Sequence, residues 1–105
     1  MTKTETAKRF LRRIFVKEDH AEYYEIDGKR DGEYKYWYDN GHLLARYYFI
    51  DDKLDGELKR WYKNGQLKEH CYYKNNKLDG EYKRWRPDGK PLDCVYYKNG
   101  VKIND

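Results

Sequence analysis

The 105-residue sequence predicts an all-β protein, an elongated single-layer antiparallel meander of repeated β-hairpins with a short N-terminal amphipathic helix. Two observations predict the sheet. Glycines and tryptophans recur at an interval of 24 residues, which indicates a repeat protein. Thirteen tyrosines combine strand propensity with a large apolar body and a polar tip, and these properties suit the half-buried positions of a thin sheet.

Residues 1–19 are predicted to form a basic amphipathic helix and a linker. The helix contacts, at helical spacing after Ala7, are expected to be Phe10, Leu11, Ile14 and Phe15. The opposite, basic face consists of Lys8, Arg9, Arg12 and Arg13. Three roles fit such a helix: a cap on the first strand, a docking helix for a partner protein, or an anchor on anionic lipid through residues 4–17.

The net charge of +4 is concentrated in this first segment. Residues 1–17 hold six bases against one acid, whereas residues 18–105 hold seventeen bases against eighteen acids. No nucleic acid is therefore expected on the repeats, because binding to phosphates requires an excess of Lys and Arg.

Residues 20–105 are predicted to form the repeat domain. Three stretches, DGEYKYWYDNG, DGELKRWYKNG and DGEYKRWRPDG, are each followed by an apolar stretch that ends in a paired aromatic. The expected division is a half repeat at 20–31, contributing one orphan strand, and repeats at 32–55, 56–79 and 80–105. A meander of about seven strands follows, given the usual strand length.

Each repeat contains one dipeptide that is typical of a two-residue type I′ hairpin turn. These dipeptides are Asn40-Gly41, Asn64-Gly65 and Asp88-Gly89. In the second repeat this turn places Gly56 opposite Tyr73, Leu58 opposite Cys71, Arg60 opposite Glu69 and Tyr62 opposite Leu67. The glycine at the head of each first strand is expected to make room for the aromatic ring opposite, such as that of Tyr73.

Alternation along the strands predicts two unequal faces. A tyrosine face carries an aromatic and aliphatic stripe with two charge pairs, Arg60 with Glu69 and Arg84 with Asp93. The opposite tryptophan face carries three rows of recurring residues. They are the aromatic residues Trp37, Trp61, Trp85, Tyr48, Tyr72 and Tyr96, the acids Glu33, Glu57 and Glu81, and the bases Lys35, Lys59 and Lys83.

The recurring residues resemble the MORN-repeat family, in the variant whose DGExxxWYxNGxL unit recurs at about 24 residues. The resemblance covers residues 20–103. Such repeats occur in bacterial proteins described as antitoxin components and in proteins of giant DNA viruses. The resemblance implies a twisted single-layer sheet that acts as a scaffold for protein contacts or self-association, with phospholipid binding as an alternative.

The expected function is a non-enzymatic scaffold that binds a protein partner or a second copy of itself through its aromatic sheet. The predicted contact residues are Trp37, Trp61, Trp85, Tyr48, Tyr72 and Tyr96. Plain packing within the chain is an alternative role for these side chains. Three alternative functions are an antitoxin that neutralises a cognate toxin, a component of a large viral assembly, and a membrane-surface tether that uses the N-terminal helix.

No catalytic residue, cofactor or metal ligand is expected in this sequence. The three histidines fall in different repeats, and the recurring glutamates alternate with lysines as on a solvated sheet face. Cys71 is expected to act as a small hydrophobic side chain. With only two cysteines and no apolar run long enough to span a bilayer, the expected location is intracellular, either the cytoplasm or a viral particle.

Overall fold

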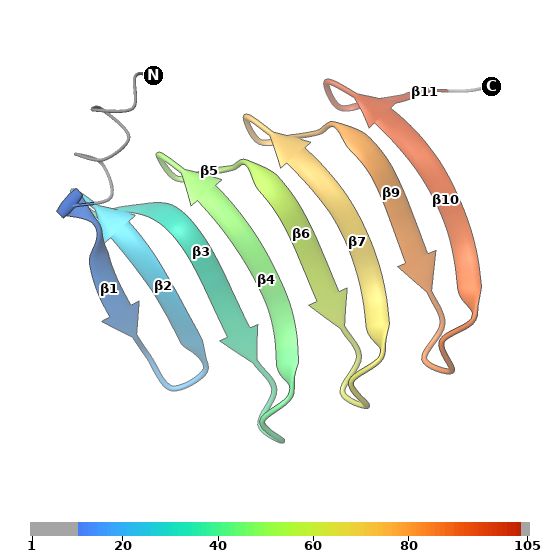
Figure 1. The fold of residues 1–105 in the computed structure, drawn as a ribbon, viewed down its shortest axis with the longest axis horizontal. Helices are drawn as coiled ribbons and strands as arrows, with labels where there is room; N and C mark the ends of the chain where they lie inside the picture. Colours follow the sequence, from blue (N-terminus) through green and yellow to red (C-terminus); the bar gives the residue numbers. More distant parts are fainter. Residues whose placement is uncertain (1–10, 104–105) are drawn as a thin grey trace.

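The structure, a computed structural model, describes residues 11–103. They form one antiparallel sheet whose main path is β1-β2-β3-β4-β6-β7-β9-β10-β11, with β5 paired to β4 and β8 paired to β7 (Figure 1). The strands are β1 (Ile14–Lys17), β2 (Ala21–Ile26), β3 (Lys29–Trp37), β4 (Leu43–Ile50), β5 (Lys53–Leu54), β6 (Gly56–Trp61), β7 (Leu67–Lys74), β8 (Lys77–Leu78), β9 (Gly80–Trp85), β10 (Pro91–Lys98) and β11 (Val101–Ile103). Extents of 42 × 39 × 19 Å match a single layer, and the predicted all-β meander is confirmed.

Strand β1 lies where the sequence predicts the end of a helix. Residues 1–10, which include Phe10, Lys8 and Arg9, lie outside the described residues. Ile14 and Phe15 belong to β1 and pair with β2, so the helix contacts predicted for them are wrong. A run of β-branched and aromatic residues favours a strand where the edge of β2 offers unpaired backbone groups. The strand of the half repeat, β2, was predicted to be an orphan first strand, but it pairs with β1 on one side and with β3 on the other.

The hairpin loops differ from the predicted type I′ turns. In the hairpin loop of the second repeat only Gly65 has a positive φ, of 89°, and its amide donates to the carbonyl of Tyr62. The amide of Tyr62 donates to Gln66, as in a type I turn closed by a glycine bulge. Asn64 accepts a hydrogen bond from the amide of Gln66 through its side chain, which favours this turn. The bulge places Leu67 opposite Trp61, so the predicted pairing with Tyr62 is wrong.

The type I′ turns lie at the opposite ends of the strands, which we call the corners. Two successive residues have positive φ in each corner: Asp27-Gly28, Asp51-Asp52, Asn75-Asn76 and Asn99-Gly100. Neighbouring corners are joined by backbone hydrogen bonds, for example from the amide of Asn76 to the carbonyl of Leu54 at 2.8 Å. The corners therefore form one continuous edge along the repeat direction (Figure 1).

The central register agrees with the sequence analysis. Gly56 lies opposite Tyr73 and Arg60 lies opposite Glu69. With strict alternation, this register places most of the small core on the tyrosine face. The buried apolar residues are Ala21, Ala45, Phe49, Leu58 and Cys71.

A candidate binding surface on the tryptophan face

A carboxylate lies at the centre of each repeat on the tryptophan face. Glu81 accepts a hydrogen bond from the hydroxyl of Tyr96 at 3.2 Å and pairs with the Nζ of Lys83 at 3.0 Å. The first repeat has the same arrangement, with Glu33 bound by Tyr48 at 3.3 Å and by Lys35 at 3.3 Å. Each glutamate thus holds a tyrosine hydroxyl and a lysine in place.

The middle repeat replaces the tyrosine hydroxyl by other donors. Arg46 donates to Glu57 at 3.1 Å and His70 contacts the other carboxylate oxygen at 3.0 Å. Burial alone would raise the pKa of Glu57, but the bond from His70 and the charge of Lys59 outweigh it, so this pKa lies below its ordinary value. The ring of His70 packs on Tyr72 with the ring centroids 5.2 Å apart, and Tyr72 stays on the surface.

The tyrosines of this face also join one repeat to the next. A Cβ placed on Gly56 would lie 3.4 Å from the Cβ of Tyr48, and one on Gly80 would lie 3.5 Å from the ring of Tyr72. The predicted ring over Gly56 was that of Tyr73, so this detail is wrong. We call Gly32, Gly56 and Gly80, each at the head of the first strand of a repeat, the head glycines. They have a second reason for being glycine, because φ at Gly56 is 116°.

The three tryptophans are half-buried near the hairpin loops. Trp37 lines a groove of about 330 Å³ between the β1–β2 turn and the first hairpin loop. Trp85 lines a second groove, of about 350 Å³, together with Leu92 and Cys94. The tryptophans thus combine packing within the sheet with partial access to solvent. Their role in partner contact remains a prediction.

Exposed apolar side chains form a row along the corner side of the same face. Alternate strands of the main path, β2, β4, β7 and β10, each carry one member of this row, and such strands lie about 10 Å apart. The members are each between 37% and 51% exposed: Phe15, Tyr24, Ile50, Tyr72, Tyr96 and Ile103. We call this set the corner row. It crosses the sheet from β1 to β11, and sequence reasoning identified only Tyr72 and Tyr96 as contacts and Phe15 as part of a helix.

The tyrosine face is more closed by its own contacts. Arg84 donates two hydrogen bonds to Asp93, at 2.5 and 3.1 Å, and Arg60 pairs with Glu69 at 3.6 Å, which confirms both predicted charge pairs. The guanidinium of Arg30 lies 4.1 Å from the centre of the Phe49 ring. Charged side chains therefore cover much of the aromatic stripe on this side.

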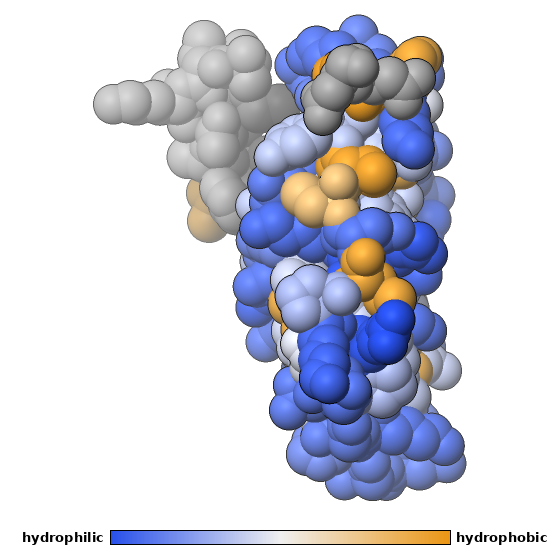
Figure 2. Space-filling view, turned by 90° about the vertical axis from the view of Figure 1, so that its right-hand side faces the viewer, coloured by the Kyte–Doolittle hydropathy of each residue, from blue (hydrophilic) through white to orange (hydrophobic). Residues whose placement is uncertain are grey.

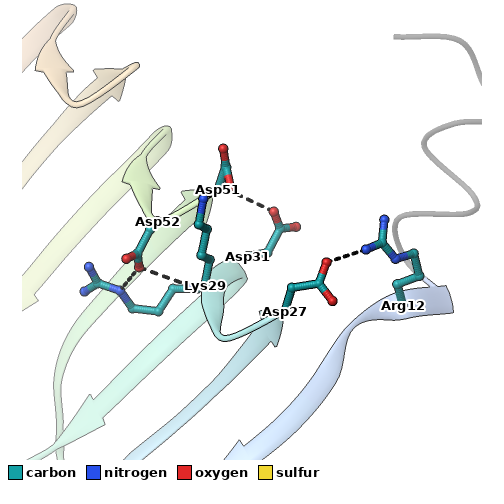
Figure 3. A network of polar contacts seen from close by, with 7 residues as sticks. Arg12, Asp27, Lys29, Asp31, Asp51 and Asp52 are labelled. Carbon is teal, nitrogen blue, oxygen red and sulfur yellow. Dashed lines mark hydrogen bonds and ion pairs between the residues drawn. The ribbon is translucent and has the colours of Figure 1, made fainter.

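Two arginines of the predicted basic face contact acids in or near the first corners, where Arg13 is largely covered and Arg12 stays exposed. Arg12 lies 2.5 Å from Asp27 (Figure 3), and Arg13 lies 3.1 Å from Asp31. Asp31 is 1% exposed and also accepts the amide of Asp51 at 3.1 Å. The sequence signal for the hydrogen bond from the corner amide is the aspartate that recurs before each head glycine. Asp55 accepts the amide of Asn75 in the second repeat as Asp31 accepts the amide of Asp51.

Residues 11–103 carry histidines, cysteines and carboxylates on several strands. In this range no three His, Cys, Asp or Glu side chains are grouped so that they could hold a metal ion. Within the same residues no helix has the length and apolar character needed to cross a membrane. His20 contacts Asp39 near the first loop, and this hydrogen bond raises the pKa of His20 above its ordinary value.

A family model described as a MORN repeat variant matches residues 30–51, 54–75 and 78–100. The chain belongs to the MORN-repeat family. No curated protein and no solved structure matches it. Each matched segment contains the last strand residues before a head glycine, one complete hairpin and part of the following corner. MORN repeats are in general modules for contacts with proteins or membrane lipids, and a scaffold role is compatible with that use.

Proposed function

We propose that this MORN-repeat protein is a non-enzymatic scaffold that binds a partner protein through its tryptophan face. The observation that carries the proposal is the corner row, an apolar series that crosses the whole sheet while the chain's own core lies largely on the other face. A contiguous apolar surface rimmed by charged residues is typical of a protein contact site.

The size of the face fits a stable interface. The sheet measures 42 by 39 Å in its plane, and a standard interface needs roughly 800 Å² from each partner. Tyrosines and tryptophans supply contact area at a low cost in side-chain entropy. Glu81 accepts the hydroxyl of Tyr96, and His70, bound to Glu57, packs on Tyr72, so two aromatics of the corner row are held in position by neighbouring side chains.

Photo-crosslinking in the native source tests the proposal. A benzoyl-phenylalanine is placed at Ile50, Tyr72 or Tyr96 on the tryptophan face, and at Tyr36 on the opposite face as the matched exposed control. We expect one protein to be crosslinked from all three positions and not from the control. Purified, that protein should bind the wild-type chain and lose binding to the variant Ile50→Glu. Crosslinks from Tyr36 alone, or none from the three positions, would contradict the proposal.

The identity of the crosslinked species also decides between the alternatives from the sequence. A crosslinked dimer would assign the same face to self-association, and a toxin or a capsid protein would identify an antitoxin or a viral component. Binding only to vesicles with anionic lipid, and to no protein, would replace the proposal by a membrane role.

A further inference from the structure

The middle of the tryptophan face collects positive charge in a line that crosses the strands. Successive strands of the main path, β3, β4, β6, β7 and β9, each place a basic side chain at the same level. In order they are Lys35, Arg46, Lys59, His70 and Lys83, each directly opposite the next. We call this set the basic row. Like charges directly opposite each other, such as Arg46 and Lys59, destabilise a strand pair, so the row favours anionic groups beside it.

The carboxylates of the chain balance the basic row least well at its centre. The outer lysines have their own acids, Glu22 and Glu33 beside Lys35 and Glu81 beside Lys83. Glu57 is shared by three members of the row, at 3.1 Å from Arg46, 3.9 Å from Lys59 and 3.0 Å from His70. The Nε atom of Arg46 is buried and has no hydrogen-bond partner among the described residues. One carboxylate thus faces three basic side chains.

A second group of lysines lies on the corner side of the same face. Lys77 of β8 lies directly opposite Lys74 of β7, again a pair of like charges, and Lys53 of β5 takes the place of Lys77 in the preceding repeat. We call Lys53, Lys74 and Lys77 the corner lysines. Within the described part of the chain none of them has an ion pair. The two acids of these corners bind other groups, Asp55 the amide of Asn75 and Asp79 the Nζ of Lys98.

The corner row lies between these two groups of positive charge. Tyr72 has His70 and Lys74 two residues away on its own strand, and both share its face. Across the strands it lies opposite a carboxylate, that of Glu57. Figure 2 looks onto the β10–β11 side and shows small apolar patches surrounded by hydrophilic residues. A partner that matches this surface needs carboxylates on both sides of a line of apolar side chains.

We propose that the partner of the tryptophan face contacts it with an acidic amphipathic helix that lies across the strands. Its apolar side chains rest on the corner row, and its carboxylates reach the basic row on one side and the corner lysines on the other. This inference rests on the proposed function and adds the chemical class of the partner to it. Opposite charges arranged in this way give specificity and faster association.

The spacing of the repeats favours a helix over an extended segment. Equivalent residues of successive repeats, such as Tyr72 and Tyr96 or Lys59 and Lys83, are two strand spacings apart, which is about 9.6 Å. Residues seven apart in a helix are separated by about 10.5 Å along its axis, so one heptad advances by nearly one repeat. On one side of an extended segment, side chains recur every 6.6 Å or about that distance, which does not match.

Other anionic surfaces match this face less well. A nucleic acid or a bilayer presents phosphates at close intervals, so phosphates would also lie against Glu57 and Glu81, which stand opposite Tyr72 and Tyr96. A protein segment can keep its acids on the two flanks. The near balance of seventeen bases and eighteen acids in residues 18–105 also gives no general attraction for a polyanion.

A designed peptide tests the charge and the spacing together. The probe is three copies of the heptad LAAEEAQ, in which glutamates flank a line of leucines, and the control peptide repeats LAAKKAQ. We expect fluorescence anisotropy to show binding of the glutamate peptide that weakens as salt is added. The lysine peptide should bind at least about tenfold more weakly, and a scrambled glutamate peptide at least about threefold more weakly.

The double variant Lys74→Glu/Lys77→Glu reverses the charge of two corner lysines without removing an ion pair of the described residues. It exchanges one pair of opposed like charges for another, so the fold should persist, and circular dichroism checks this. We expect about tenfold weaker binding of the glutamate peptide. The matched control, Lys63→Glu/Lys90→Glu, changes exposed residues in the hairpin loops at the other end of the strands and should change binding by less than about twofold. If the first double variant does not fold, Lys53→Glu alone should weaken binding.

No binding of the glutamate peptide, equal binding of the glutamate and lysine peptides, or equal losses in the two double variants would overturn the inference. Tighter binding to phosphatidylserine vesicles or to oligothymidylate than to the glutamate peptide would also overturn it. The proposed function is judged separately. If the photo-crosslinked protein binds Lys74→Glu/Lys77→Glu as tightly as the wild-type chain, the face binds a protein but the acidic helix is refuted. If the glutamate peptide binds as expected and no protein is crosslinked, the proposed function fails and the charge selectivity stands.

Discussion

Gly56 has a backbone conformation that separates it from the other turn positions. Its φ of 116° lies well beyond the left-handed region, whereas Gly28, at a corner, has a φ of 79°. Asn76 and Asp52 take the place of Gly28 in later repeats with φ of 72° and 68°, so that position accepts asparagine. The same substitution at the two glycines therefore tests the backbone and not the loss of glycine itself.

We expect Gly56→Asn to lower the free energy of unfolding by about 1–3 kcal/mol, the cost of a residue held in a sparsely populated backbone region. The new Cβ would lie 3.4 Å from Tyr48, an ordinary contact, so packing adds little to this cost. Gly28→Asn should change stability by less than about 0.5 kcal/mol, because no atom lies within 4 Å of a Cβ there.

Urea unfolding followed by tryptophan fluorescence measures both variants, and a shared m value checks that the transitions are comparable. Equal losses for the two substitutions would refute the reasoning. Such a result would mean that the head glycines serve another purpose than their φ.

Three further predictions concern single contacts. Tyr62→Phe should lower the free energy of unfolding by about 1 kcal/mol in thermal or urea unfolding, because the half-buried carbonyl of Trp85 loses its hydroxyl donor. Cys94 is exposed while Cys71 is 1% exposed with its pKa raised by burial to about 12, so a thiol reagent should label one cysteine in the native protein and two after unfolding. Two fast thiols in the native state would show that the Cys71 side of the sheet opens. The pair of His20 with Asp39 has a raised histidine pKa and a lowered aspartate pKa, so it stabilises the fold between about pH 4 and 6.5. This contribution should fade as pH rises through the raised histidine pKa, and Asp39→Asn should reduce that pH dependence of the unfolding curve, because Asp39 is the largest cause of the raised pKa.

The turns show where sequence reasoning succeeds and where it ends. The centring of the hairpin on Asn64-Gly65 predicts that Gly56 lies opposite Tyr73, and the structure has this register although its turn type differs. The dipeptide Asn64-Gly65 fits two turn types equally well. Only the hydrogen bond from the amide of Gln66 to the Asn64 side chain, seen in three dimensions, selects the bulged turn.

The first strand has the same kind of ambiguity. Ile14 and Phe15 continue a helical stripe from Leu11, but together with Val16 they also form a short run with strand propensity. The edge of β2 decides between the two structures, and that edge exists only once the sheet has formed. Propensity over four residues cannot outweigh a row of unpaired backbone groups.

The surface residues were predictable in position but not in contacts. Alternation places Tyr48 and Tyr72 on the tryptophan face, and the pairing of Tyr48 with Glu33 agrees with it. No sequence pattern shows that their rings also pack over Gly56 and Gly80 of the next repeat. Ile50 was missed because its exposure depends on the position of the corner turn.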